Sequence, residues 1–228
     1  MQPSYIPQIQ PENLCEALKL CSVRKHDEEY FVGKKDQSGN ITEVPFSDIA
    51  NSDTYEGKPL VRTYSSGHVF LDTTREKVWL VTTEKDGKIQ HQFTGGSPME
   101  DINKEVFYTM DGTIKIHLDK VEDNAIIRTY NRTGAKVIEP WNEIPLVDWV
   151  LMEGKDEKEE SFWKLVCLMH FVVKEHEGIL SYKNGVEYTV GGDWYSIDNL
   201  PNTPNVAPNA YLVAKKAQEL VENLYKLF

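Results

Sequence analysis

Two groups of residues have types and spacing that suit the handling of a charged ligand. The first is an aromatic residue followed by a glycine pair, Phe93, Gly95 and Gly96. Adjacent glycines let the backbone turn sharply and approach another group closely, because neither carries a Cβ. An aromatic ring beside them could stack on a base or a sugar. The alternatives are an ordinary turn for the glycines and core packing for the ring.

The second group is a pair of arginines, Arg128 and Arg132, within residues 121–134. Apolar residues recur there at helical spacing, and Gly134 can end the helix in the left-handed conformation. Arginines one turn apart share a helix face, where their guanidinium groups could hold a phosphate. The alternative is that Arg128 pairs with a nearby carboxylate or carbonyl group.

The elements that must position these groups are mostly strands. Apolar runs predict strands at 60–64, 68–72, 78–82 and 146–151, with hairpins at 29–46 and 106–118. A short helix is expected after Pro11, and a longer amphipathic one at about 207–227. The apolar segment 162–174 fits a central strand, and a buried helix fits nearly as well. Strands in the middle with helices late and apart predict an α+β fold built in layers.

Composition narrows the function classes. The 228 residues carry a formal net charge of −11, which argues against binding nucleic acid through the phosphate backbone. No apolar run is long enough to cross a bilayer, and residues 1–5 lack the features of a signal peptide. The three cysteines lack the Cys-x-x-Cys spacing, so we expect free thiols and a cytoplasmic protein.

Three blocks, taken in order, resemble a Nudix domain. They are a strand leading to Phe93 and the glycine pair, the helical segment 125–134, and the ending 193–201 followed by a helix. The resemblance implies an α/β/α-type Nudix sandwich, with a mixed β-sheet flanked by helices. It implies a Nudix-like domain at 60–228, a hairpin inserted at about 102–120, and an N-terminal extension at 1–59. It also implies that Phe93, Gly95 and Gly96 line the entrance of a ligand cleft.

The helix departs from the family signature, in which glutamates on one helix face hold the metal. Arg128 matches the signature arginine, but Thr129, Asn131 and Arg132 stand where the carboxylates are expected. Threonine and asparagine are weak Mg²⁺ ligands, and Arg132 adds positive charge where a cation would bind. The resemblance therefore implies a pseudoenzyme that binds a nucleotide-like or other phosphorylated ligand through Phe93, Gly95, Gly96, Arg128 and Arg132, without standard hydrolysis.

Two other hypotheses stay open. A divergent pyrophosphohydrolase could hold Mg²⁺ with displaced carboxylates; the catalytic candidates are Glu100, Asp101, Glu122 and Asp123, and the metal-binding candidates are Glu100, Asp101 and Glu105. The charged run 153–160 could also supply a carboxylate. Their alternative roles are solvated loops and, for the pair at 122–123, complementing the helix dipole. In the other hypothesis, the chain is an interaction module whose residues 1–59 form a homodimer or partner contact.

Overall fold

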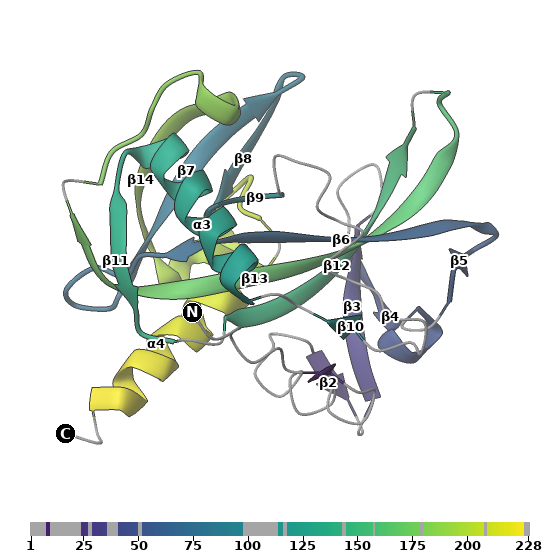
Figure 1. Ribbon diagram of the computed structural model, residues 1–228, viewed down its shortest axis with the longest axis horizontal. Coiled ribbons are helices and arrows are strands. Elements are labelled where there is room, and N and C mark those ends of the chain that lie inside the picture. The colour runs from purple at the N-terminus through teal and green to yellow at the C-terminus, as the bar shows by residue number, and fades with distance from the viewer. Residues whose placement is uncertain are drawn as a thin grey trace. The chain divides into compact units, whose positions relative to one another are not determined.

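The computed structural model describes part of the chain (Figure 1). The described residues are 8–9, 24–26, 29–35, 41–49, 52–97, 114–115, 118–142, 145–156, 158–177, 180–207 and 209–225. The predicted short helix after Pro11 lies outside them, as does most of the predicted insertion at 102–120. Glu100, Asp101 and Glu105 lie outside them as well.

The chain forms two compact units, each made of three segments. Unit 1 comprises Met1–Ser65, Ser97–His117 and Val147–Leu168. Unit 2 comprises Ser66–Gly96, Leu118–Leu146 and Met169–Phe228. The sequence predicts a different division, into an extension at 1–59 and a domain at 60–228. That division stays a prediction.

Unit 1 is built from strands. Its elements are β1 (Gln8–Ile9), β2 (Arg24–His26), β3 (Glu29–Lys35), β4 (Ile41–Pro45), the 3₁₀ helix η1 (Phe46–Asp48), β5 (Thr54–Tyr55), β10 (Ile114–Lys115) and most of β12 (Leu146–Lys155). Strands β3 and β4 pair antiparallel, which confirms the predicted hairpin at 29–46. Strand β12 runs parallel to β3, with Val150 opposite Gly33.

Unit 2 contains the glycine pair and both arginines. Its first sheet places β9 (Thr94–Gly96) beside the end of β6 (Lys58–Val69), and β11 (Lys136–Pro140) beside the end of β13 (Ser161–Glu177), with β6 and β13 as neighbours. Its second sheet has the order β14 (Thr189–Ser196), β7 (Lys77–Lys85) and β8 (Lys88–Gln92). A turn with Asp86 at φ 53° and Gly87 at φ 72° joins β7 to β8, as the Asp-Gly pair predicts.

Helices α3 (Leu118–Thr133) and α4 (Ala210–Tyr225) pack on opposite faces of the first sheet (Figure 1). Successive strand residues point to opposite faces. Accordingly, Val69 and Phe93 belong to the apolar cluster that includes one face of α4. Their neighbours His68 and Thr94 contact Thr129 of α3. This arrangement confirms the predicted α+β class with a mixed sheet flanked by helices.

Three details differ from, or refine, the sequence prediction. The strand predicted at 60–64 and the start of that predicted at 68–72 form one strand, β6, which ends at Val69; Gly67 lies inside the pairing with β9 and does not start a turn. Leu118 opens α3, although a strand was expected to end there. The segment 162–174 lies within the strand β13, which excludes the helical alternative. Among the described residues, no helix is long and apolar enough to span a membrane.

Candidate functional site

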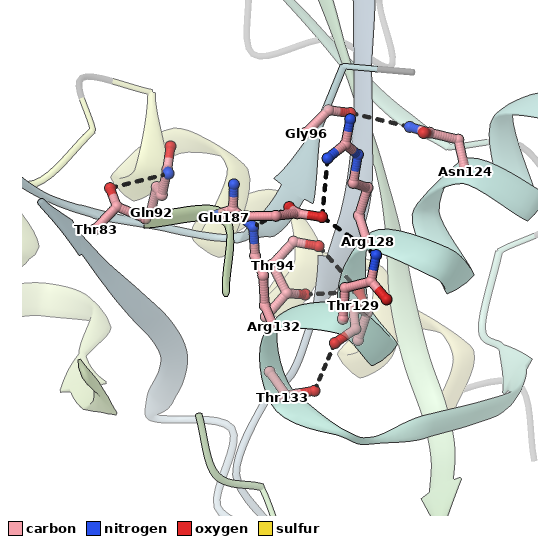
Figure 2. A network of polar contacts seen from close by, with 11 residues as sticks. Thr83, Gln92, Thr94, Gly96, Asn124, Arg128, Thr129, Arg132, Thr133 and Glu187 are labelled. Carbon is pink, nitrogen blue, oxygen red and sulfur yellow. Dashed lines mark hydrogen bonds and ion pairs between the residues drawn. The ribbon is translucent and has the colours of Figure 1, made fainter. Parts of the chain in front are cut away.

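The two arginines of α3 share one carboxylate, which comes from the 3₁₀ helix η2 (Val186–Tyr188). Arg128 Nη1 lies 2.9 Å from Glu187 Oε1, and Arg132 Nε lies 2.9 Å from Glu187 Oε2. Asn131 Nδ2 donates a longer hydrogen bond of 3.3 Å to Oε1. Figure 2 shows the carboxylate between the two guanidinium groups, bonded to each through a different oxygen.

This cluster is shielded from solvent. The side chains of Arg128, Arg132 and Glu187 are 14%, 9% and 16% exposed. Arg132 Nη1 is buried and has no hydrogen-bond partner among the described residues. Buried polar groups are normally hydrogen-bonded, so an unpaired guanidinium nitrogen leaves a donor available for an additional acceptor.

The pKa values of Arg132 and Glu187 reflect their burial and their contact with each other. Burial lowers the pKa of Arg132, the hydrogen bond to Glu187 and its charge raise it, and the charge of Arg128 lowers it; the pKa ends below its ordinary value. Burial alone would raise the pKa of Glu187, but the hydrogen bonds and charges of Arg132 and Arg128 outweigh it, and the pKa falls below 4.5. Glu187 is therefore ionised at neutral pH, and its charge compensates the charges of Arg128 and Arg132 that it contacts.

The backbone that presents Glu187 is strained. Glu187 has φ 50° and ψ 43°, Tyr188 has φ 62°, and Gly185 has φ 79°. Left-handed conformations are easy for glycine, but each costs about 1–3 kcal/mol at a residue with a side chain. Two such residues in succession show that the surrounding contacts hold the carboxylate in this position.

Helix α3 is held against the sheet by buried polar contacts. Asn124 Nδ2 donates to Ser66 Oγ at 2.7 Å and to Gly96 O at 2.9 Å, and Ser66 Oγ donates to Val121 O at 2.8 Å. One turn further along, Thr129 Oγ1 lies 2.9 Å from Thr94 O. These bonds determine the position of α3 on the sheet and its rotation about its own axis. They therefore determine where Arg128 and Arg132 lie.

A buried histidine completes this polar layer. His68 Nδ1 lies 2.9 Å from Thr129 Oγ1. Burial lowers the pKa of His68 to about 3 and that of the neighbouring His170 to about 4, so both rings are neutral at pH 7. Neutral rings in these positions serve packing and hydrogen bonding.

The glycine pair has a structural reason in the pairing of β9 with β6. A Cβ on Gly95 would come within 2.9 Å of Ser66 O, and a Cβ on Gly67 within 2.6 Å of the Gly95 Cα. A Cβ on Gly96 would meet Arg128 Cδ and Nε at 3.1 Å. Gly96 therefore leaves room for the Arg128 side chain to lie against β9 (Figure 2).

The other predicted site residues are placed differently. The ring of Phe93 is 4% exposed and packs edge-to-face on His170 at 4.9 Å between ring centroids. Glu122 and Asp123 lie in the first turns of α3, and burial together with the charge of Asp123 raises the pKa of Glu122. Within the described residues, no group of three or more His, Cys, Asp or Glu side chains could hold a metal ion.

Sequence reasoning did not identify Glu187. The alternative that Arg128 pairs with a carboxylate is confirmed, but the partner comes from a loop 55 residues beyond Arg132. The only local signal is an isolated glutamate after Gly185, where a tight turn precedes a strand. No helix or strand periodicity connects such a residue to a distant helix.

Comparisons with known proteins concern the fold. No family model matches the sequence, and no curated protein does. Solved structures that match include the E. coli ORF135 protein, with 11% identity over 72% of this chain and 94% of that one, at a TM-score of 0.46. A MutT protein from Bacillus halodurans has 15% identity over 67% of this chain and 80% of that one, at 0.41.

A Nudix-family hydrolase from Clostridium perfringens has 16% identity over 70% of this chain and 98% of that one, at a TM-score of 0.40. Several of the matched structures are titled as Nudix or MutT proteins, the family that the sequence resembles. At such identities the likeness concerns the fold, and it assigns neither an activity nor a ligand to this chain.

Proposed function

We propose that this chain is a Nudix-like protein that binds a nucleotide-like or other phosphorylated ligand at Arg128 and Arg132, without standard Nudix hydrolysis. The observation that carries the proposal is a buried nitrogen of Arg132, Nη1, which has no partner among the described residues. It lies in a cluster where Arg128 and Arg132 both contact the carboxylate of Glu187. A phosphate supplies up to two negative charges and three acceptor oxygens, which match these donors.

The setting supports selective capture of an anion. The chain as a whole has a formal charge of −11, so two arginines side by side in a shielded place are a local exception. Charge-assisted hydrogen bonds are stronger when water is partly excluded, as it is at side chains this little exposed. The acidic remainder of the chain disfavours large polyanions, which favours a small ligand over nucleic acid.

The part of the proposal that excludes standard hydrolysis rests on the residues of one face of α3. Thr129 is fully buried and bonded to Thr94, and Asn131 and Arg132 contact Glu187. No side chain of this set is a free carboxylate, and hard oxygen ligands are what Mg²⁺ requires. These contacts support the proposal that the helix does not hold a metal ion in the way the family signature implies.

The proposal is tested by separating binding from turnover. A panel of nucleoside diphosphate compounds is titrated into the protein by calorimetry, and the same mixtures are assayed for phosphate-containing products with Mg²⁺ or Mn²⁺. We expect saturable binding of one or more members and no metal-dependent product. Absence of binding across the panel and to inorganic pyrophosphate would contradict the binding role.

One observation favours a second function, a divergent hydrolase. Glu122 and Asp123 are adjacent carboxylates, and their repulsion contributes to the raised pKa of Glu122. A divalent cation would relieve that repulsion. If the assay detects turnover, Glu122→Gln and Asp123→Asn should abolish it under this hypothesis. The exposed Glu222→Gln serves as the matched control, since it lies on α4.

A further inference from the structure

The strained loop that carries Glu187 points to regulation of the proposed site. We infer that Glu187 is an internal competitor for the anion: its carboxylate occupies the two arginines in the ligand-free protein, and a phosphorylated ligand displaces it. This inference rests on the proposed function, because it concerns what the same two arginines bind before the ligand arrives.

The geometry of Glu187 resembles that of a bound anion. Its two oxygens each accept from a different arginine at 2.9 Å, which is how a phosphate would bridge them. The carboxylate has only two oxygens, and Arg132 Nη1 is left without a partner among the described residues. A phosphoryl group of higher charge, with a third oxygen, satisfies donors that the carboxylate does not.

The loop is anchored in a way that permits this exchange. Lys183 N donates to Arg132 O at 2.7 Å, and Gly185 N donates to Thr189 O at 2.7 Å. These bonds keep both ends of the loop close to α3 and β14 while the intervening residues change conformation. Tyr188 is 57% exposed, so little buried surface resists movement of the segment.

Backbone strain favours movement of the loop that carries Glu187 away from the two arginines. Glu187 and Tyr188 both adopt left-handed conformations that side chains disfavour. When a ligand takes over the arginines, the contacts that hold these conformations are lost, and both residues can relax. The competitor is therefore held strongly enough to exclude weak anions and weakly enough to be displaced by a phosphate.

As a consequence, the site should select ligands by their charge. A ligand's apparent affinity is reduced by the fraction of protein in which Glu187 already fills the site. Monocarboxylates, which match Glu187 in charge, gain nothing from the exchange. Dianionic phosphoryl compounds gain the extra charge and the extra oxygen, so the site should select them over carboxylates.

The test is a titration of inorganic pyrophosphate into the full chain, without metal, for the wild type, Glu187→Gln and the control Glu222→Gln. Glutamine keeps the size of Glu187 and an acceptor oxygen but removes the competing charge. We expect Glu187→Gln to bind pyrophosphate about 5–150-fold more tightly than the wild type, and the control to be unchanged. Equal or weaker binding by Glu187→Gln, with a binding wild type, overturns the inference and leaves the proposed function intact. Absence of pyrophosphate binding by both proteins overturns the inference, and the proposed function is then decided by the panel of nucleoside diphosphate compounds.

Hydrogen exchange on the wild type gives a second readout that does not depend on the folding of a variant. Amides of the segment 186–188, which follow the anchored amides of Lys183 and Gly185, should exchange about 5-fold or more faster when pyrophosphate saturates the protein, because Glu187 no longer holds the loop. Slower or unchanged exchange there, at a concentration where calorimetry shows saturation, contradicts displacement.

Discussion

At the scale of residues, the site consists of an ion-pair cluster with one negative and two positive members. Removing one partner of a buried ion pair is more destabilising than the pair is stabilising, because the remaining charge loses its compensation. Glu187 compensates both arginines, so it is the member whose loss has the largest consequence.

We therefore expect Glu187→Ala to lower the free energy of unfolding by about 3 kcal/mol. The released strain at positions 187 and 188 offsets part of the loss of both ion pairs. Urea denaturation at pH 7 measures the difference, with Glu222→Ala as the control. A loss no larger than that of the control would show that the cluster contributes nothing to folding.

The buried histidines predict how stability depends on pH. The pKa values of His68 and His170 are lowered to about 3 and about 4, whereas an unfolded chain has them near 6.5. Between pH 6.5 and pH 4 the unfolded state binds more protons, so stability is fully present above pH 6.5 and falls as pH drops. Each histidine contributes a slope of about 1.4 kcal/mol per pH unit in that window.

Replacing His170 separates its contribution to the pH dependence of stability from that of His68. In His170→Leu, the fall in unfolding free energy between pH 6.5 and pH 5 should be smaller than in the wild type, because the share of His170 is lost while His68 and His91, whose pKa values burial also lowers, still contribute. Urea denaturation at the two pH values gives this difference directly, whatever the effect of the substitution at pH 7. An unchanged pH dependence would mean that His170 is not buried as a neutral ring.

At the scale of elements, strand β9 is the connection between the sheet and the site. It pairs with β6 through Gly67 and Gly95, bonds to α3 through Gly96 and Thr94, and leaves space for Arg128. A change in the spacing of β6 and β9 should therefore disturb the position of α3 and its arginines.

Gly67→Ala tests this connection. Its Cβ would lie 2.6 Å from Gly95 Cα and from Thr94 O, which are backbone atoms that cannot rotate away. We expect a loss of about 2–3 kcal/mol in unfolding free energy, as for an overpacked core. The matched control is Gly191→Ala in β14, where the nearest atom is a Thr82 side-chain carbon at 3.3 Å. Equal thermal stability of the two variants would show that the β6–β9 contact tolerates a side chain.

The elements also show which features of the fold can be predicted from the sequence. Local patterns predict the hairpin of β3 and β4, the extent of α4 and the end of α3 at Gly134, which has φ 79° and donates to Tyr130 O. These features depend on neighbours along the chain. The sequence also places Arg128 and Arg132 on one face.

The remaining features depend on contacts between distant segments. Glu187 meets the arginines only after the sheet and α3 are assembled, and no local signal encodes that meeting. The glycine pair is conspicuous in the sequence, but its structural reason, the close approach of Gly67 and Arg128, requires two other segments. Phe93 illustrates the converse, since its ring packs in the core.

At the scale of the whole molecule, unit 1 depends on residues before position 60. Strand β3 pairs in parallel with β12, so deleting 1–59 leaves the edge of β12 without its partner. Unpaired strand edges promote aggregation. In size-exclusion chromatography, we expect the chain 60–228 to elute as aggregates and the full chain as a single species. A monodisperse truncated chain would support the independent domain predicted for 60–228; a full chain eluting as a dimer would support the homodimer prediction.

The central claim is that the two arginines of α3 bind a phosphorylated ligand. Its most direct test is calorimetric titration of inorganic pyrophosphate, without metal, into the wild type, Arg128→Gln and the control Arg75→Gln, whose arginine stacks on Tyr225 outside the cluster. The loss of one charge-assisted hydrogen bond predicts affinity about ten- to a hundredfold weaker for Arg128→Gln and unchanged for Arg75→Gln. Pyrophosphate binding that is equally strong in all three proteins would contradict the claim.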